Sequence, residues 1–426
     1  MTVTKQRKKK TKPLGKPPKG AMLMRTSERS TFNRCRWQWG RIYGEGLRPI
    51  QEHPALRFGS LIHEALEVRY PVGLKRGPHP AQTFEKLYAA DLKKNEDEWG
   101  MFADEEWTDA LELGVDMLEG YIDKYGRDEQ WEVLASEMKF AIPVYMPREK
   151  AVPVLQNILI GALMEAGVLT EKQVEGKEPL FWYVGTMDGV WRDRSSARVR
   201  INDYKTTSGD AVKEGEAKGV LDEQATAYWT FGVDYLIAKA LMKARVIEAL
   251  DGMLYTFLKK SKKDERPVNE QGYALNKPKK DAVMAYYEAE NIPLPTKGTG
   301  KNGNVLLDDL IANLGDAALA LGETSKDQPA KRFHREIVYR GQHDRDAARM
   351  RVVEEFLEME AVKAGLLPYR KTPGSGYPSL QCKACSVRDL CETDEAGQDW
   401  EETRDLLMTD WNPYSAHEII EEGKAS

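Results

Sequence analysis

Apolar residues recur at helical spacing in several parts of the chain. Between residues 58 and 70, Phe58, Leu61, Ile62 and Ala65 follow the i, i+3, i+4, i+7 pattern of a helix that buries one face. This segment is therefore expected to pack against a core. The pattern of apolar and polar residues predicts further helices over residues 27–39, 81–125, 222–250 and 346–365.

After residue 130, apolar residues recur at every second position, which is typical of β-strands. Over residues 131–142, Leu134, Met138, Phe140 and Ile142 lie on one face and Glu137 lies on the other. Further strands are predicted over residues 181–191, 197–205, 253–258 and 336–340. Residues 259–332 carry lysine-rich and glycine-rich loops, and we interpret them as an insertion. This order of elements predicts an α/β core decorated with helices.

The composition is that of a folded chain and excludes several classes of protein. The 426 residues are 41% hydrophobic and 31% charged, with a mean hydropathy of -0.59, which excludes collagen-like, mucin-like and wholly disordered proteins. No apolar stretch is long enough for a transmembrane helix, and none follows the N-terminal charges as in a secretory signal. Four cysteines are too few for a disulfide scaffold of this size. We therefore expect a protein of a reducing cytoplasm, with no membrane partner.

The two ends of the chain carry opposite charge, although the net charge is only -5. Residues 1–20 hold eight basic and no acidic residues, with three prolines among them. Residues 392–426 hold eleven acidic and two basic residues. We expect a flexible basic tail over 1–20, which either binds phosphate or only solubilises the chain, and a partly ordered acidic tail over 393–426.

The most informative residues lie on the strand over 197–205 and on the strand before it. Asp203 and Lys205 are two positions apart, so their side chains project from the same face of a strand. Asp188, on the preceding strand of the same hairpin, can reach the same point. Two carboxylates beside an ammonium group suit a divalent metal that activates water against a phosphodiester, with the lysine orienting that water or neutralising charge on the phosphate. The same triplet is common at solvated strand ends, so its neighbours decide the interpretation.

Three neighbouring residues are compatible with such a site. His63 lies on the flank of the apolar face of its helix, and Gln224 and Tyr228 are one turn apart on another helix. Taken alone, His63 fits a core histidine, and the Gln224–Tyr228 pair fits an ordinary helix surface. A histidine beside two aspartates would instead form a mixed nitrogen and oxygen site, which suits Mn²⁺ as well as Mg²⁺.

In chain order the motifs are G-x-x-x-H, a strand glutamate, G-x-x-D, D-x-K and Q-x-x-x-Y. This series resembles the RecB-like branch of the PD-(D/E)XK nucleases, which includes the CRISPR-adaptation exonuclease. The resemblance implies a restriction-endonuclease-like core, in which helices flank a mixed central sheet, with helical insertions. It also implies these roles: metal ligands His63, Asp188, Asp203 and the Tyr204 carbonyl; first-strand acid Glu137; catalytic lysine Lys205; and support of the site or the DNA by Gln224 and Tyr228.

The four cysteines fit one pattern. Cys382, Cys385 and Cys391 form a C-x₂-C-x₅-C cluster, and Cys35 is the only other cysteine. Four thiolates can hold zinc or an iron–sulfur cluster, and the spacing alone favours neither. One cysteine before the nuclease core and three after it is similar to the iron–sulfur RecB-like nucleases, so the resemblance favours [4Fe–4S] over zinc. Such a site would join the two ends of the domain in a structural role.

Three basic groups are candidates for contacts with nucleic acid, although each such group is more often a solvated surface than a binding site. They are Arg25, Arg29, Arg34 and Arg36; Lys259, Lys260, Lys262, Lys263 and Arg266; and Arg345, Arg349 and Arg351.

Together these features predict one nuclease domain over residues 21–392 that hydrolyses DNA, most simply as an exonuclease on single-stranded or end-containing DNA in recombination or repair. The chain has no G-x-x-x-x-G-K-[ST] motif, so a helicase or recombinase partner would have to separate strands. The alternatives are an accessory protein that binds DNA ends with a subordinate or inactive nuclease site, and a zinc-stapled structural protein.

Overall fold

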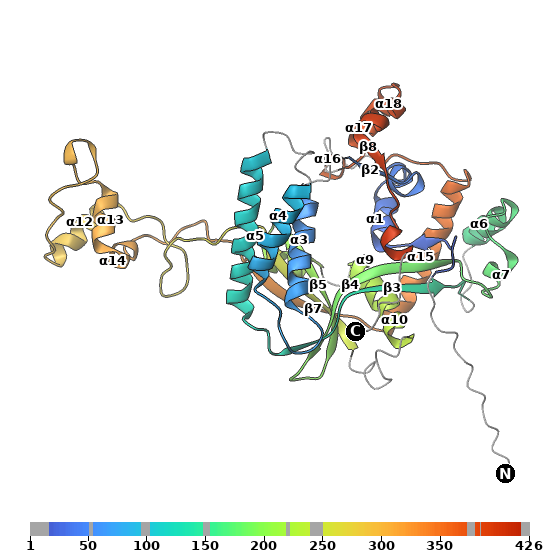
Figure 1. Cartoon of the computed structure of the whole chain (residues 1–426), viewed down its shortest axis with the longest axis horizontal. Coiled ribbons are helices and arrows are strands. Elements are labelled where there is room, and N and C mark those ends of the chain that lie inside the picture. The colour runs from blue at the N-terminus through green and yellow to red at the C-terminus, as the bar shows by residue number, and fades with distance from the viewer. Residues whose placement is uncertain are drawn as a thin grey trace, which may run out of the picture.

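A computed structural model describes residues 17–50, 54–94, 103–147, 154–218, 222–238, 250–372, 380–383 and 385–418. The predicted basic tail falls almost entirely outside these ranges. In the main body, helices cover both faces of a central sheet, and a smaller unit stands apart from it at the end of a long connection (Figure 1). Within these ranges, no helix is long and apolar enough to cross a membrane.

The sheet has six strands and mixed directions. Its strands are β1 (Leu23–Met24), β3 (Trp131–Val144), β4 (Phe181–Asp193), β5 (Val199–Thr207), β6 (Leu250–Lys259) and β7 (Phe333–Tyr339). The order is β1-β4-β5-β6-β7, with β3 paired to β4. Strand β4 is antiparallel to β3 and β5, β5 is parallel to β6, and β6 is antiparallel to β7. The mixed central sheet flanked by helices confirms the predicted fold class.

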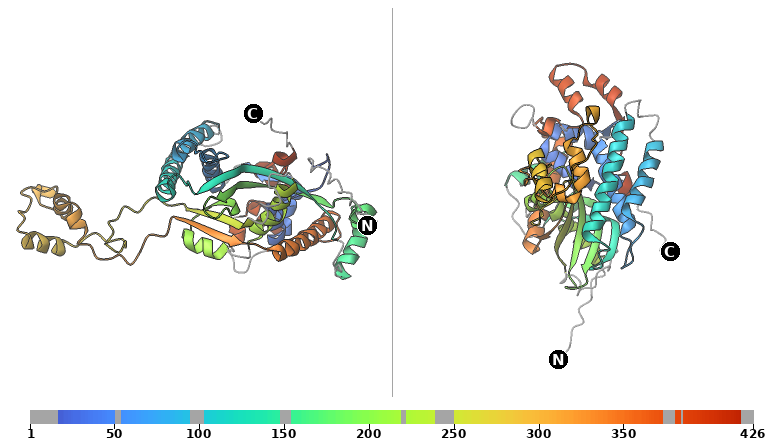
Figure 2. Two further views of the ribbon diagram at one scale, coloured as in Figure 1. Left: turned by 90° about the horizontal axis from the view of Figure 1, so that it is seen from below. Right: turned by 90° about the vertical axis from the view of Figure 1, so that its left-hand side faces the viewer.

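Two groups of helices cover the two faces of the sheet, as the edge-on view shows (Figure 2). One face packs on α3 (Pro54–Arg69), α4 (Pro80–Lys94) and α5 (Ala103–Tyr125). The other packs on α1 (Thr26–Arg34), α6 (Val154–Glu165), α9 (Glu223–Ala227), the π-helix η2 (Tyr228–Gly232), α10 (Val233–Ala238) and α15 (Gln342–Lys363). Between these groups the sheet is buried on both sides, so polar side chains on it are shielded from water.

The remaining elements are shorter. They are α2 (Arg36–Trp39), the π-helix η1 (Gly40–Gly44), β2 (Leu47–Pro49), α7 (Glu171–Val174), α8 (Ala211–Lys218), α12 (Lys280–Ala289), the 3₁₀-helix η3 (Lys301–Gly303), α13 (Leu307–Leu314), α14 (Asp316–Leu319), α16 (Leu380–Lys383), α17 (Arg388–Glu395), α18 (Trp400–Leu407), β8 (Met408–Asp410) and α19 (Ser415–Glu418).

Most predicted elements form where the sequence places them, but two differ. The helix predicted over 27–39 is interrupted at Cys35, whose backbone is extended, so that it forms α1 and α2. The helix predicted over 222–250 begins with Asp222 as its N-cap, whose side chain accepts a hydrogen bond from Ala225 N–H. It cannot extend to Leu250, because Leu250 pairs with Val199 as the first residue of β6. Parallel pairing inside a buried sheet overrides the helical spacing there. Residues 95–102 and 239–249, also predicted as helix, lie outside the described ranges.

The segment between β6 and β7 is more ordered than the predicted loops. It forms α12, α13 and α14 around a small core of Val283, Tyr287 and Leu310. In Figure 1 these helices lie far from the sheet. Because β6 and β7 are antiparallel neighbours, the end of β6 lies beside the start of β7, and the segment leaves the sheet and returns to it at the same place.

The C-terminal residues return to the N-terminal part of the chain. Residues 393–418, expected to belong to an acidic tail, form the end of α17, then α18, β8 and α19. Strand β8 pairs antiparallel with β2, and the Tyr414 hydroxyl donates a hydrogen bond to the Glu28 carboxylate on α1. This segment therefore forms part of the folded body.

A buried ion pair connects the two outermost strands of the sheet. Arg335 on β7 donates two hydrogen bonds to Asp128, just before β3, at 2.7 and 2.5 Å. The Tyr70 hydroxyl also donates to Asp128, at 2.6 Å. Because Asp128 is only 5% exposed, removing one charge would leave the other buried without a partner.

We expect Asp128→Asn to lower the free energy of unfolding by about 3–5 kcal/mol, the usual cost of breaking a buried pair. Asparagine tolerates the φ of 54° at this position, so the backbone is not the cause. Urea denaturation measures the change. The neighbouring Glu129→Gln, whose side chain is 74% exposed, is the control and should change stability by less than about 0.5 kcal/mol. Equal stability of both variants would show that this pair does not hold the sheet.

Candidate active site

Strands β4 and β5 separate where the predicted acids lie. Their pairing ends at Gly189 and Asn202, whereas β5 stays paired with β6 as far as Thr207. The Asp188 side chain crosses the opening, and its Oδ2 accepts a hydrogen bond from Tyr204 N–H at 2.8 Å. A side chain thus replaces backbone pairing, which satisfies the Tyr204 N–H and holds Asp188 beside the start of the opening.

Helices from both faces of the sheet reach this opening. His63 comes from α3, and its Nδ1 lies 3.3 Å from Asp188 Oδ2. Gln224 comes from α9 on the opposite face, and its Oε1 accepts a hydrogen bond from Lys205 Nζ at 2.7 Å. The structure therefore brings these predicted residues together, although they come from distant parts of the sequence.

Glu137 faces the same point from β3. Its neighbours Ser136 and Met138 pair with Gly189 and Met187, which places Glu137 across from Asp188. Its φ of 42° is unusual for a residue in a strand. Burial, followed by the negative charges of Asp188 and Glu67, raises the pKa of Glu137 to about 7.

His63 responds to the same charges in the opposite sense. Burial disfavours the imidazolium, but the hydrogen bond to Asp188 and the charge of Asp188 outweigh it and raise the pKa of His63. The His63 imidazolium is thus stabilised by the carboxylate of Asp188.

Asp203 and Lys205 form a buried pair next to these groups. Asp203 is 1% exposed, and burial raises its pKa to about 6 despite the nearby Lys205. Lys205 Nζ lies 2.6 Å from Asp203 Oδ2. Burial would lower the pKa of Lys205, but the charge of Asp203 raises it. Gln224 also donates to the Tyr228 hydroxyl at 3.1 Å and to Asp203 Oδ1 at 3.4 Å, which closes a ring of polar contacts.

Sequence reasoning missed three residues of this environment. Glu67 adds negative charge beside Glu137, and its place one helical turn after His63 was a usable signal. Asp222 caps α9 and lies close to the Tyr255 hydroxyl, and the Tyr255 ring centroid is 6.0 Å from Lys205 Nζ. Only the pairing of β5 with β6 brings Tyr255 there, so no local pattern could have found it.

The side chains at the opening suit a hard divalent cation. In the described ranges no three histidine, cysteine, aspartate or glutamate side chains are arranged to hold a metal ion, and the ammonium of Lys205 contacts Asp203. However, three acids lie together, and the raised pKa values of Glu137 and Asp203 show that their charges are poorly compensated. Carboxylate oxygens with one imidazole are a donor set for Mg²⁺ or Mn²⁺, so the residues fit such an ion once Lys205 moves aside.

The four cysteines lie in one region, away from the acids. Cys35, Cys385 and Cys391 pack around a small core that includes Trp37 and Leu390. Burial, with Cys35 and Cys382 nearby, raises the pKa of Cys385. Burial also raises the pKa of Cys391, to about 11. At Cys385 and Cys391 the thiol is therefore favoured over the thiolate. Within the described ranges, the cysteines are not arranged to hold a metal ion.

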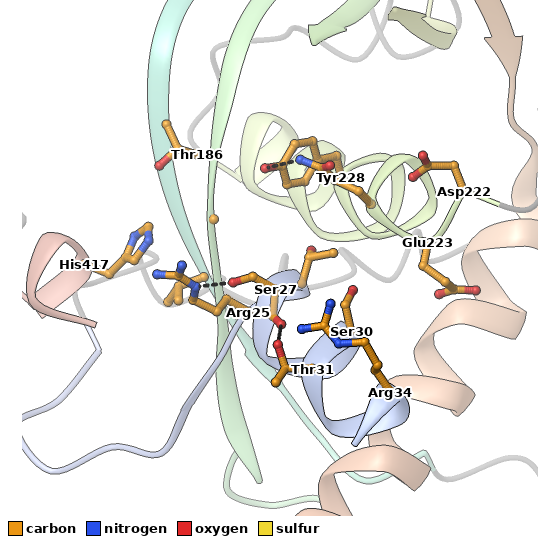
Figure 3. Close-up of a pocket in the computed structure, with 14 residues that line it drawn as sticks. Arg25, Ser27, Ser30, Thr31, Arg34, Thr186, Asp222, Glu223, Tyr228 and His417 are labelled. Atoms are coloured by element: carbon orange, nitrogen blue, oxygen red, sulfur yellow. Dashed lines mark hydrogen bonds between the residues drawn. The ribbon is translucent and has the colours of Figure 1, made fainter. Parts of the chain in front are cut away.

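A polar cavity of about 870 Å³ lies beside Gln224, which contacts Lys205 and Asp203 (Figure 3). Gln224 and Tyr228 form one wall, and residues from α1, β4 and α19 form the others. The cavity therefore shares two of its residues with the ring of contacts around Lys205.

Comparison with family models gives a match to the PD-(D/E)XK nuclease superfamily over residues 26–392. The chain belongs to the PD-(D/E)XK nuclease superfamily. Comparison with curated proteins gives no match. Superfamily membership supports a metal-dependent phosphodiester hydrolase that binds nucleic acid, and members typically use Mg²⁺ or Mn²⁺. The match ends at residue 392, so α18, β8 and α19 lie beyond it.

The raised pKa of Glu137 predicts how stability of the metal-free nuclease depends on pH. Between its ordinary value of 4.5 and about 7 the unfolded chain loses a proton that the folded state keeps. Stability therefore falls as pH rises through this window, and the full penalty is present above it. Glu137→Gln removes the penalty, so its melting temperature in EDTA should exceed that of the wild type at pH 8. The two should melt together near pH 4.5. A lower melting temperature of the variant at pH 8 would contradict this assignment.

Proposed function

We propose that the chain is a metal-dependent DNA nuclease that acts as an exonuclease on single-stranded or end-containing DNA. The observation that carries the proposal is the convergence of Asp188, Asp203 and Lys205 where β4 and β5 separate. A role in recombination or repair, with a helicase or recombinase to separate strands, is part of the same proposal.

The proposed roles are those that the resemblance to RecB-like nucleases implies for these residues. His63, Asp188 and Asp203 would hold Mg²⁺ or Mn²⁺, with the Tyr204 carbonyl as an additional ligand. Such an ion, when bound, supplies a water of lowered pKa and stabilises charge on the phosphate. Glu137, which lies across from Asp188 on β3, is the proposed first-strand acid beside this ion.

Lys205 is the proposed electrostatic catalyst. Its ammonium is held by Gln224, which Tyr228 in turn contacts. Once it has moved off Asp203, this ammonium can neutralise charge that develops on the phosphate. Gln224 and Tyr228 are thus proposed to position Lys205 and the strand next to it.

A second candidate is an accessory protein that binds DNA ends and has an inactive site. The ion pair between Lys205 and Asp203 favours this candidate to a degree, because it must open before a metal can use Asp203 Oδ2. The other acids around the opening favour turnover, since an inactive site has no need to keep poorly compensated charges buried.

For the cysteines we propose a structural [4Fe–4S] cluster, with zinc as the alternative. The support is their common location: Cys35 comes from the junction of α1 and α2, and Cys382, Cys385 and Cys391 come from the region of α16 and α17. The raised pKa values of Cys385 and Cys391 mean that metal binding would have to displace their protons.

The nuclease proposal predicts degradation of end-labelled single-stranded DNA by purified protein with Mg²⁺ or Mn²⁺. Asp203→Asn should abolish it, because the amide keeps the shape of the carboxylate but not its charge. Lys205→Ala should lower kcat by roughly 10²–10³-fold, the usual cost of losing one preorganised group, without weakening metal binding, since it also frees Asp203. Gel analysis of products from each labelled end also gives polarity.

Two exposed positions in the segment between β6 and β7 supply matched controls. Asp281→Asn and Lys280→Ala on α12 make the same chemical changes far from the opening and should cleave like the wild type. Cleavage by Asp203→Asn at the wild-type rate would remove Asp203 from the site. DNA-end binding without turnover in either metal would favour the accessory protein.

The cysteine proposal predicts that protein purified without oxygen is brown and contains iron and sulfide. Cys35→Ala should bleach and destabilise it as much as Cys385→Ala, because each thiolate is one of four ligands. Visible absorbance, metal analysis and thermal unfolding make the comparison. A colourless protein with one zinc would keep the ligands but reject the cluster, and a stable brown Cys35→Ala variant would exclude Cys35.

A further inference from the structure

The cavity beside the acids has a wall that the catalytic proposal does not use. It is built by the start of α1, where Arg25 precedes the helix and Ser27, Ser30 and Thr31 face the space (Figure 3). The first backbone N–H groups of a helix carry partial positive charge, and Arg25 offers no side-chain cap to them. Hydroxyl groups and a helix N-terminus together favour an anionic ligand.

Two arginines at this wall keep their charge available. On α1 and α2, Arg29 is paired with Glu355 and Glu223, and Arg36 is paired with Glu358. By contrast, Arg25 and Arg34 have no carboxylate within ion-pair distance among the described residues. Arg25 donates to Ser27 and to the Pro413 carbonyl, and Arg34 donates to Gln38. Both arginines line the cavity, which Asp222 and Glu223 also line. Glu223 is paired with Arg29 and Arg351, and Asp222 caps α9.

His417 supplies an independent indication that the cavity takes a polar ligand. It reaches the cavity from α19, beside Arg25 (Figure 3). The residue is only 5% exposed, yet its Nδ1 has no hydrogen-bond partner within the described ranges. Burial, followed by the charges of Arg25 and Lys139, lowers the pKa of His417 to about 4, so the ring is neutral. A buried ring nitrogen without a partner is costly unless a ligand satisfies it.

We infer that this cavity binds the sugar–phosphate backbone of single-stranded nucleic acid next to the cleavage point, and that α19 completes it. The inference rests on the proposed function and names the part of the protein that holds its substrate. Arg25, Arg34 and the start of α1 contact phosphate, and His417 contacts a sugar or phosphate oxygen. Gln224 and Tyr228 connect this wall with Lys205, so a strand in the cavity continues directly to the acids.

The shape of the site selects one strand over other anions. A cavity of about 870 Å³ is much larger than one phosphate needs. Its cationic groups lie along one wall, at the start of α1, and proteins that bind single strands typically hold the backbone in a positively charged groove. The cavity therefore suits a flexible single strand of several linked phosphates.

Binding of the full-length protein to a short fluorescent oligothymidylate in EDTA tests the inference without any cleavage. Ser30 is exposed on α1 and lines the cavity, so Ser30→Asp places a negative charge there at little risk to the fold. It should weaken binding at least tenfold, whereas Ser30→Ala should have little effect. Ser196→Asp, in the exposed turn at the far end of β4, makes the same substitution and should bind like the wild type. Arg34→Gln should lower the slope of log Kd against log salt concentration by about one, which corresponds to the loss of one phosphate contact.

His417→Leu tests the contribution of α19. The change removes the unpartnered ring nitrogen and makes the position apolar. Thermal stability should therefore be equal or higher, while binding of the strand should weaken several-fold. A purely structural histidine would change stability and leave binding unaltered.

Each outcome decides one point. Wild-type affinity of Ser30→Asp and His417→Leu would overturn the inference, whether or not the protein cleaves DNA. Displacement of the strand by inorganic phosphate at similar concentration would show a free-anion site, and equal binding of a hairpin duplex would reject single-strand selection. Loss of binding in Ser30→Asp, together with absence of cleavage by the wild type in Mg²⁺ and Mn²⁺, would keep the strand site and reject only the nuclease.

Discussion

The separation of β4 from β5 is the constraint on which the rest of the site depends. One hydrogen bond, from Tyr204 N–H to Asp188, replaces the strand pairing that stops at Gly189. Because the sheet opens there, side chains from α3 on one face and from α9 on the other meet at a single point. A fully paired sheet would keep His63 and Gln224 on opposite sides of the backbone.

The opening also accounts for the raised pKa values of two acids. Acids held between two packed layers lose contact with water, which raises the pKa values of Glu137 and Asp203. Lys205 compensates for part of this charge, and the remainder makes the metal-free site costly to fold. The buried ion pair of Arg335 with Asp128 connects the outer strands, and its charges also act on the Tyr204 hydroxyl, close to the opening.

Local patterns predicted the residues that neighbour each other in sequence. Asp203 and Lys205 share a strand face, and Gln224 and Tyr228 contact each other from one helical turn apart, as their spacing predicts. Long-range pairing decided what local patterns could not. The predicted helix ends before Leu250 because β6 begins there, Tyr255 reaches Lys205 only through β6, and the acidic C-terminal segment returns to α1 through β8 and Tyr414. Side-chain spacing carries no information about these pairings.

The central claim is that these acids form a site for a divalent cation. The most direct test is calorimetric titration of metal-free protein with Mn²⁺ in buffers of different ionisation enthalpy. Glu137 and Asp203, with pKa values of about 7 and about 6, are partly protonated at pH 6.5. A cation held by His63 and Asp203, beside Glu137, must displace these protons and that of the His63 imidazolium, so the account predicts more net proton release at pH 6.5 than at pH 8.5. Binding at pH 6.5 without proton release, or no binding at either pH, would contradict it.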